Sequence, residues 1–126
     1  MWQKYIEKYE NELTQSVIPF WEKNCVDREF GGYFTSLDRD GSVYDTYKYM
    51  WMQWRVVYMF AEIYLAGYKK DSYVDIAEKG FNFLYKHGRD EAGRYYFALN
   101  RDAFFAFCSE KCLIYGGIFS SRIDKL

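Results

Sequence analysis

Arg55 is the residue of this sequence whose chemistry most needs an explanation. It stands in the segment 48–66, where most of the other residues are apolar or aromatic. Burying a guanidinium costs several kcal/mol unless a carboxylate or a ligand oxygen accepts its five donors. The segment therefore predicts that Arg55 either forms a structural salt bridge or points at a bound ligand.

The other titratable groups favour structural roles. His87 is the only histidine, and it lies in the turn motif Lys86-His87-Gly88, where we expect it to serve a loop or a helix cap. Four aspartates lie in turn-like stretches, where carboxylates commonly accept hydrogen bonds from backbone N–H groups; they are Asp38, Asp40, Asp45 and Asp102. No Ser-His-Asp set or phosphate-binding loop is found in the sequence.

The three cysteines do not form a disulfide framework. Cys25, Cys108 and Cys112 are an odd set, which fits a reducing compartment and predicts a cytoplasmic protein. Cys108 and Cys112 would share one helix face, but two thiols without a neighbouring histidine fall short of a four-ligand zinc site. We expect packing cysteines and neither a metal nor a cofactor.

Composition restricts the classes of partner. A net charge of −1 and a pI of about 5.8 give no basic surface for a phosphate backbone, so nucleic acid is not an expected partner. The N-terminus has no signal-peptide pattern, and no apolar run reaches the roughly 18 residues that would span a bilayer. With 23% aromatic residues in 126, the chain carries more apolar surface than a small domain can bury. The surplus predicts surface for a ligand, a partner or further chain.

Hydrophobic periodicity predicts three helices. The first covers 3–24, and Pro19 is expected to kink or break it. The second covers 48–66, is apolar in nearly every direction and is therefore expected to be buried all round, with Gly67 as its stop. The third starts at Ser72 as N-cap and is amphipathic, hence peripheral.

Two hairpins are predicted, one between the first and second helices and one after the third, and they are copies of each other. The first covers 31–45 and the second has its turn around 91–93. Residues 31–40 match residues 93–102 at a constant offset of 93 − 31 = 62. The repeated unit is a buried helix, an amphipathic helix and a hairpin, which predicts an array of helical pairs in two concentric rings.

Three segments carry a resemblance to a known family. They are GGYFTSLDRDGSVYDTYKYMWMQWRVVYMFAEIY at 31–64, KHGRD at 86–90 and RYYFALNRD at 94–102. Over about 5–102 the chain resembles the N-terminal part of the N-acylglucosamine 2-epimerase and cellobiose 2-epimerase family. The resemblance implies an all-α fold, a partial (α/α)6 barrel with about two of six helical-pair repeats and short β-hairpins between helices. A complete barrel of such units would need on the order of 370 residues.

The resemblance also implies a chemistry. Inverting C2 of an aldose, such as an N-acylhexosamine or a reducing-end glucose, needs two bases with pKa values near neutrality, and the family uses two opposed histidines. The family has an arginine on an inner helix that Arg55 resembles. The resemblance implies that Arg55 binds the sugar and stabilises the enediolate oxygen. Trp51, one turn earlier, either lines the same pocket or belongs to the core. Both family histidines would lie beyond residue 126, so no unaided turnover is expected.

The resemblance ends at Asp102. This divides the chain into an epimerase-like part, 1–102, and a divergent tail, 103–126, with a helix expected at 103–115. The tail is either the out-of-frame end of an interrupted gene or a genuine short form. In the second case its apolar residues would cap the open helical array; they are Phe104, Phe105, Phe107, Leu113 and Ile114.

Three functions remain open from the sequence. The first is an isomerase-family protein that is inactive alone. The second is a non-catalytic module that binds a carbohydrate or a protein. The third is one part of a split enzyme completed in trans, with self-association or a partner chain docking on the open helical face.

Overall fold

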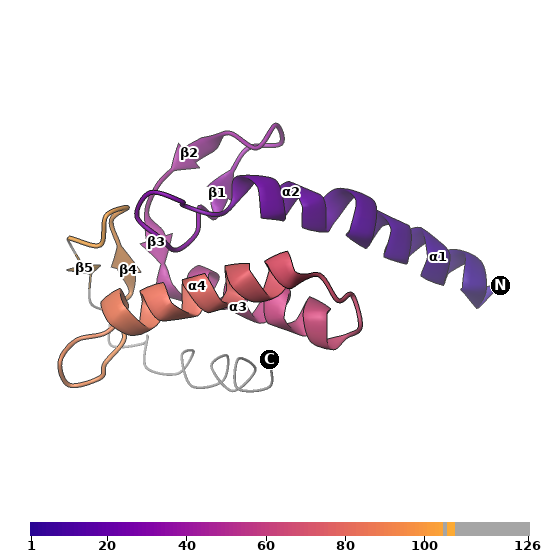
Figure 1. Ribbon diagram of the computed structural model, residues 1–126. Helices are drawn as coiled ribbons and strands as arrows, with labels where there is room; N and C mark the ends of the chain where they lie inside the picture. The colour runs from indigo at the N-terminus through magenta and orange to yellow at the C-terminus, as the bar shows by residue number, and fades with distance from the viewer. Residues whose placement is uncertain (105, 108–126) are drawn as a thin grey trace.

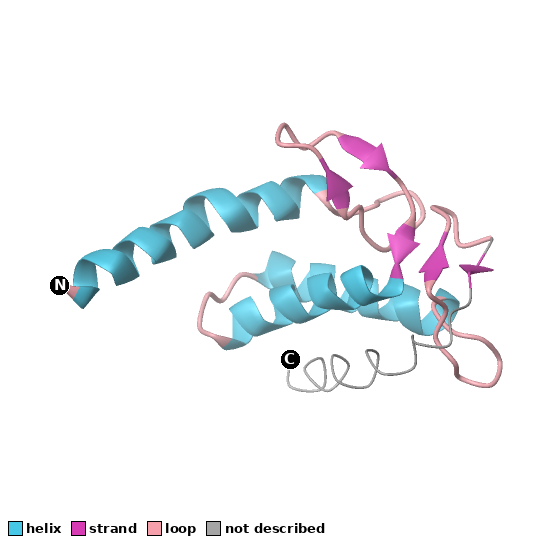
Figure 2. Cartoon of the chain, turned by 180° about the vertical axis from the view of Figure 1, so that it is seen from behind, coloured by secondary structure: helices cyan, strands magenta, loops and turns pink. Residues whose placement is uncertain are grey.

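The computed structural model describes residues 1–104 and 106–107, which form a mostly helical array with short strands at one end (Figures 1 and 2). The α-helices are α1 (Trp2–Glu12), α2 (Ile18–Asn24), α3 (Met50–Leu65) and α4 (Asp71–His87). The strands are β1 (Ser36–Leu37), β2 (Val43–Asp45), β3 (Lys48–Tyr49), β4 (Ala98–Leu99) and β5 (Ala106–Phe107). The predicted class, helical with short hairpins, is confirmed.

The N-terminal helix is distorted before Pro19 without being broken. Between α1 and α2 the chain forms a π-helical segment, Leu13–Val17, and the N–H of Ile18 donates to the carbonyl of Leu13 five residues earlier. Because proline has no N–H, a widened turn before it accommodates the missing donor. The predicted break is wrong, and the predicted distortion at Pro19 is confirmed.

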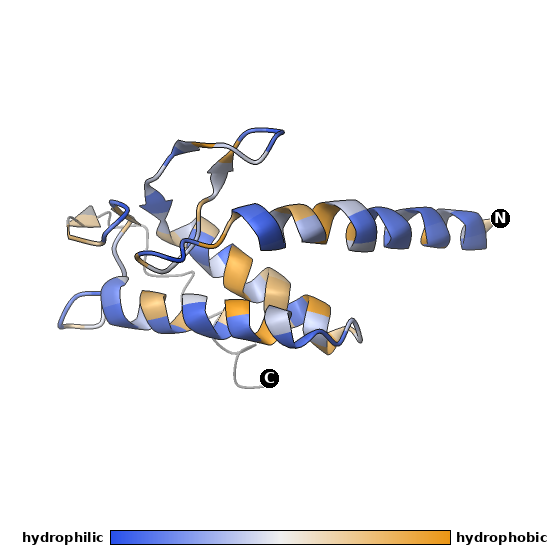
Figure 3. Cartoon of the chain, turned by 45° about the horizontal axis from the view of Figure 1, so that its top comes forward, coloured by the Kyte–Doolittle hydropathy of each residue, from blue (hydrophilic) through white to orange (hydrophobic). Residues whose placement is uncertain are grey.

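Helix α3 packs along α4, and these two helices hold most of the core (Figure 3). The contact buries Trp54, Val57 and Phe60 of α3 to 1% exposure or less. The prediction that this helix is buried all round is wrong, because Trp51 is 37% exposed and Arg55 is exposed as well. In the part of the chain that the structure describes, α4 covers only one side of α3. The helix ends where predicted, before Gly67 with its positive φ of 111°.

Helix α4 is amphipathic, as predicted, but Ser72 is not its N-cap. The helix begins at Asp71 with Lys70 as N-cap, and the Ser72 hydroxyl donates instead to Glu22 Oε1 at 2.8 Å. Ser72 thus ties the first turn of α4 to α2. In the middle of α4, Gly80 makes room for the ring of Tyr33, since a Cβ at this position would collide with the Tyr33 hydroxyl. That hydroxyl donates to the Ile76 carbonyl at 2.6 Å.

The strands confirm the repeat. Antiparallel β1 and β2 form one hairpin, and β4 pairs with β5 on one edge and with β3 on the other. The first residues of β1 and β4, Ser36 and Ala98, are separated by 98 − 36 = 62 positions. The helix expected at 103–115 is wrong at its beginning, because Ala106–Phe107 is a strand, and 108–115 lie outside the described residues. Across the residues described, no helix has the length and hydrophobicity needed to cross a membrane.

Candidate functional site

Arg55 and Trp51 lie together on the exposed face of α3. The guanidinium carbon of Arg55 is 5.0 Å from the centroid of the Trp51 ring, the geometry of a cation–π contact. Among the described residues no carboxylate forms a salt bridge with Arg55. The Arg55 side chain is exposed, so the expectation that this helix buries its guanidinium is wrong. The structure thus places the Arg55 cation against the flat ring of Trp51, and both side chains are exposed to solvent.

An aromatic hollow of about 290 Å³ lies at the N-terminal end of α3. Its lining residues are Tyr47, Tyr49, Phe97 and Ala98. The rings of Tyr49 and Phe97 meet edge to face with centroids 5.8 Å apart, and the Met50 N–H donates to the Phe97 carbonyl at 2.9 Å. The second hairpin therefore fixes this hollow next to the turn of α3 that carries Trp51.

Lys48 is a buried cation that the sequence did not predict. Its side chain is fully buried, and Nζ donates to Asp27 Oδ2 at 2.8 Å, to the Gly31 carbonyl at 2.6 Å and to the Arg101 carbonyl at 2.7 Å. Burial lowers the pKa of Lys48, and the attraction of Asp27 opposes that shift. Three short donated hydrogen bonds use all three protons of an ammonium group, so we treat Lys48 as charged.

Asp27 is the centre of this cluster. Its Oδ1 accepts the N–H groups of Glu29 and Phe30, each at 3.1 Å, and its Oδ2 accepts Arg101 Nε at 3.1 Å in addition to Lys48. Burial by itself would raise the pKa of Asp27, but the hydrogen bonds from Arg101 and Lys48 outweigh it and lower the pKa to about 2. The cluster anchors β3, and through it the start of α3, to the loop 27–33.

Gln53 supplies a second buried anchor for the same loop. Its Oε1 accepts the Tyr33 N–H at 2.9 Å, and its Nε2 donates to the Tyr33 carbonyl at 2.8 Å. The amide thus pairs with the backbone of Tyr33 as a neighbouring strand would. The sequence offered one signal for these anchors, which is a polar residue between aromatic ones: Lys48 between two tyrosines and Gln53 before Trp54.

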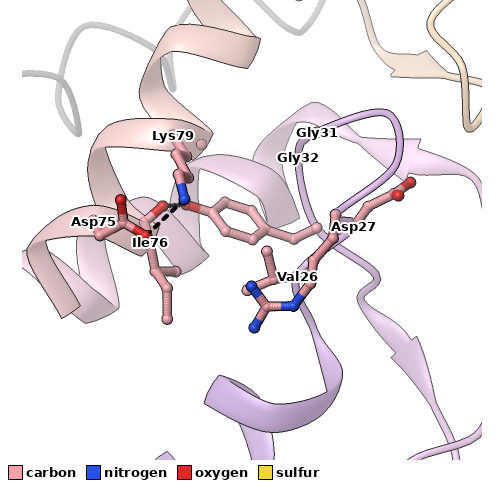
Figure 4. Close-up of a pocket in the computed structure, with 10 residues that line it drawn as sticks. Val26, Asp27, Gly31, Gly32, Asp75, Ile76 and Lys79 are labelled. Carbon is pink, nitrogen blue, oxygen red and sulfur yellow. Dashed lines mark hydrogen bonds and ion pairs between the residues drawn. The ribbon is translucent and has the colours of Figure 1, made fainter. Parts of the chain in front are cut away.

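A further pocket of about 320 Å³ lies between the loop 26–33 and α4 (Figure 4). Asp75 and Lys79 stand at its α4 side and form an ion pair with each other at 2.9 Å. Figure 4 shows Val26, Asp27 and the two glycines of the loop on the opposite side. The Tyr33 hydroxyl is already bonded to Ile76, whereas the Arg28 side chain, which also lines the pocket, makes no hydrogen bond or ion pair within the described residues.

His87 lies within α4, so its predicted loop or capping role is wrong, whereas the turn aspartates have the structural roles that were predicted. His87 is the last residue of α4, with its ring 5.2 Å from that of Phe83, and burial followed by the nearby positive charges of Lys86 and Lys48 lowers its pKa. Each turn aspartate accepts a backbone N–H, as predicted for Asp38, Asp40, Asp45 and Asp102.

Of the three cysteines, the structure describes only Cys25. It is fully buried, and burial raises the pKa of its thiol to about 12. Cys108 and Cys112 lie outside the described residues. Within residues 1–104 and 106–107, no three His, Cys, Asp or Glu side chains group together as metal ligands.

Comparison with known proteins identifies relatives by sequence. Residues 32–117 match the family model of N-acylglucosamine 2-epimerase (GlcNAc 2-epimerase). The chain is 40% identical over 91 residues to N-acylglucosamine 2-epimerase of Mus musculus, and 37% identical over 89 residues to that of Homo sapiens. These alignments cover 71% and 69% of this chain but 21% of each relative. The family match continues beyond Asp102, and the boundary placed there stays a prediction.

Solved structures agree with this relationship. Cellobiose 2-epimerase from Bacillus thermoamylovorans B4167 matches with a TM-score of 0.71 and 27% identity, over 80% of this chain and 26% of the other. A D-mannose isomerase matches with a TM-score of 0.64 and 28% identity, over 70% of this chain and 23% of the other. The chain thus spans about a fifth to a quarter of the length of these relatives, and its helices and hairpins correspond to part of an (α/α)6 barrel. The chain belongs to the N-acylglucosamine 2-epimerase family.

Proposed function

We propose that this chain contributes one wall of the sugar site of a 2-epimerase or aldose–ketose isomerase, with Arg55 and Trp51 as the residues that contact the sugar. The observation that carries the proposal is the exposed Arg55 guanidinium held against the Trp51 ring at 5.0 Å, with no salt bridge in the described part of the chain. Relatives named as N-acylglucosamine 2-epimerase, cellobiose 2-epimerase and D-mannose isomerase support the reaction class.

The proposed role of Arg55 follows from the charge that this reaction develops. Removing the proton at C2 of an open-chain aldose places negative charge on the oxygens of an enediolate. A guanidinium donates two parallel hydrogen bonds to such a pair of oxygens, and it stays charged throughout. Trp51 orients the guanidinium by the cation–π contact and offers its flat face to the apolar side of the sugar.

Proton transfer at C2 needs a base on each face of the substrate, and we assign neither role to this chain. His87, its only histidine, is the last residue of α4 and packs on Phe83. In this proposal both bases lie on helices outside the described residues. The chain by itself then binds the sugar without turning it over.

Titration of the purified chain with cellobiose and with N-acetylglucosamine, followed by NMR, tests this proposal. Arg55→Ala should weaken binding about tenfold or more, because hydrogen bonds to a charged group contribute roughly 1.5–3 kcal/mol. Arg28→Ala is the matched control, since Arg28 is also exposed and makes no side-chain hydrogen bond or ion pair within the described residues. Equal binding by native chain and Arg55→Ala would refute the site.

The same sugars incubated with the chain in heavy water test the second half of the proposal. We expect no deuterium at C2, and incorporation by the native chain would refute the assignment of both bases to other helices.

A non-catalytic sugar-binding module is the second candidate function, and the aromatic hollow of Tyr47, Tyr49 and Phe97 favours it. Aromatic walls with few polar groups are common in small-molecule sites. Binding that is insensitive to Arg55→Ala but lost in Phe97→Ala would support this candidate over the first.

A further inference from the structure

The two repeated units are joined by ion pairs of Arg101 with Asp27 and Glu29, and we call the Asp27–Arg101 pair the clamp. Arg101, from the second unit, donates from Nε to Asp27 Oδ2 at 3.1 Å and from Nη2 to Glu29 Oε2 at 2.9 Å. The repeat places Arg39 at the position equivalent to Arg101, because 101 − 39 = 62, the offset that also relates β1 to β4.

Asp90 is the equivalent of Asp27. The Asp27 N–H donates to the Gly32 carbonyl, and the Asp90 N–H donates to the Arg94 carbonyl, so each aspartate opens a hairpin turn. The second turn is one residue shorter, which explains the offset of 90 − 27 = 63 before it. The chain therefore carries two aspartates and two arginines of the clamp, and joins only Asp27 with Arg101.

The two remaining halves, Arg39 and Asp90, are complementary in charge and do not bind each other within the described residues. The Arg39 side chain is exposed and makes no hydrogen bond or ion pair in the part of the chain that the structure describes. Asp90 binds one cation, the exposed Arg94 at 2.8 Å, whereas Asp27 binds two, Lys48 and Arg101. Asp90 thus has one cationic partner fewer than Asp27.

The two sheets also differ, because the first lacks a strand that the second has. The second sheet has the order β3-β4-β5, and the first has only β1-β2, whose members are the repeat equivalents of β4 and β5. Within the described residues, the edge of β1 that corresponds to the β3-paired edge of β4 has no strand on it. An unpaired strand edge beside an unpaired arginine is a surface that favours association.

We propose that copies of this chain associate head to tail, with Arg39 of one copy bound to Asp90 of the next, so that the contact between molecules repeats the Asp27–Arg101 contact within the molecule. The occupant is a second copy because the chain itself carries both complementary groups at two ends. The tip of the β1–β2 hairpin and the loop between α4 and β4 lie at opposite ends of the group of strands (Figures 1 and 2). A contact of this kind either closes into a ring or continues as an open chain.

The ion pair sets the orientation of the copies, while the strand edge and the exposed apolar residues contribute affinity. Charge reversal at one partner should therefore abolish the defined assembly, and reversal at both partners should restore it. This inference does not depend on sugar binding, so it can fail while the proposed function stands.

Analytical ultracentrifugation of the full chain over a concentration series tests the inference. The native chain should sediment as species larger than a monomer, and the fraction of chain in these species should rise with its concentration. Arg39→Glu and Asp90→Arg should each weaken association about tenfold or more, because each places like charges opposite one another. An equimolar mixture of the two variants should recover the native assembly, since every contact between unlike copies is then complementary.

Two controls carry the same charge changes at other exposed positions. Arg28→Glu and Glu78→Arg should assemble as the native chain does. Far-UV circular dichroism checks that each variant folds; Arg39→Glu, at an exposed hairpin tip, keeps the test informative should Asp90→Arg unfold its turn. A native chain that is monomeric throughout, a native-like assembly of Arg39→Glu, or a mixture of folded variants that fails to assemble would each overturn the inference.

Discussion

Replacing Lys48 with methionine should destabilise the fold by about 3 kcal/mol. Methionine keeps the length and apolar stem of the side chain, so the change removes chiefly the ammonium and its three hydrogen bonds to Asp27, Gly31 and Arg101. Breaking a buried ion pair by removing one partner costs roughly 3–5 kcal/mol, because the other charge is left buried. Arg101 still contacts Asp27 and compensates in part, which places the expected loss at the lower end.

Urea unfolding followed by circular dichroism measures this loss. Lys79→Met is the matched control, because the Lys79–Asp75 pair is 65% and 57% exposed and a surface pair contributes about 0–1 kcal/mol. The double variant Asp27→Asn/Lys48→Met should be more stable than Lys48→Met, since it leaves no uncompensated carboxylate. A Lys48→Met variant within about 0.5 kcal/mol of the native chain would refute the assignment of a buried ammonium–carboxylate pair.

Two further predictions follow from the same core. The pKa of Asp27 is about 2 in the fold, whereas its ordinary value is 3.8. The ionised carboxylate therefore contributes about 2 kcal/mol to the free energy of unfolding, and this contribution is complete above pH 3.8. It is lost as the pH falls toward 2, so the native urea midpoint should drop more steeply over this acid range than that of Asp27→Asn, and parallel curves would contradict the argument. Gly80→Ala should lower the melting temperature despite alanine's higher helix propensity, because the new methyl collides with the Tyr33 hydroxyl and overpacking costs about 1–3 kcal/mol; an unchanged or raised melting temperature would show that Tyr33 can move aside.

The elements were predictable because their signals are local. The hydrophobic period predicts the helices, the turn residues predict the hairpins, and the 62-residue offset predicts the repeat. The structure confirms all three. The first turn of α4 was misassigned because Ser72 has a partner 50 residues away, Glu22, which competes with the capping role. Local periodicity predicts helix at Ala106–Phe107, because it does not report the tertiary pairing of this strand with β4.

The candidate site was predictable in its residues but not in its surroundings. Arg55 and Trp51 do lie together, but no local pattern predicts that α4 covers one side of α3 and leaves the side with these two residues accessible. Lys48 was missed for a related reason: its partners Asp27 and Arg101 are 21 and 53 positions away, and only the fold brings them within hydrogen-bond distance.

The π-helical segment Leu13–Val17 sets the rotation of α1 relative to α2. A turn whose hydrogen bond spans five residues holds one residue more than a regular α-turn, as an insertion into an ordinary helix would leave it. Deleting one residue there would restore the regular ladder and rotate α1 by about 100° about its axis relative to α2. The Tyr68 hydroxyl would then lose Glu10, its acceptor at 2.8 Å, and the exposed aromatic stripe of α1 would face a new direction. The orientation of that stripe is thus encoded by residue count in this segment as much as by residue type.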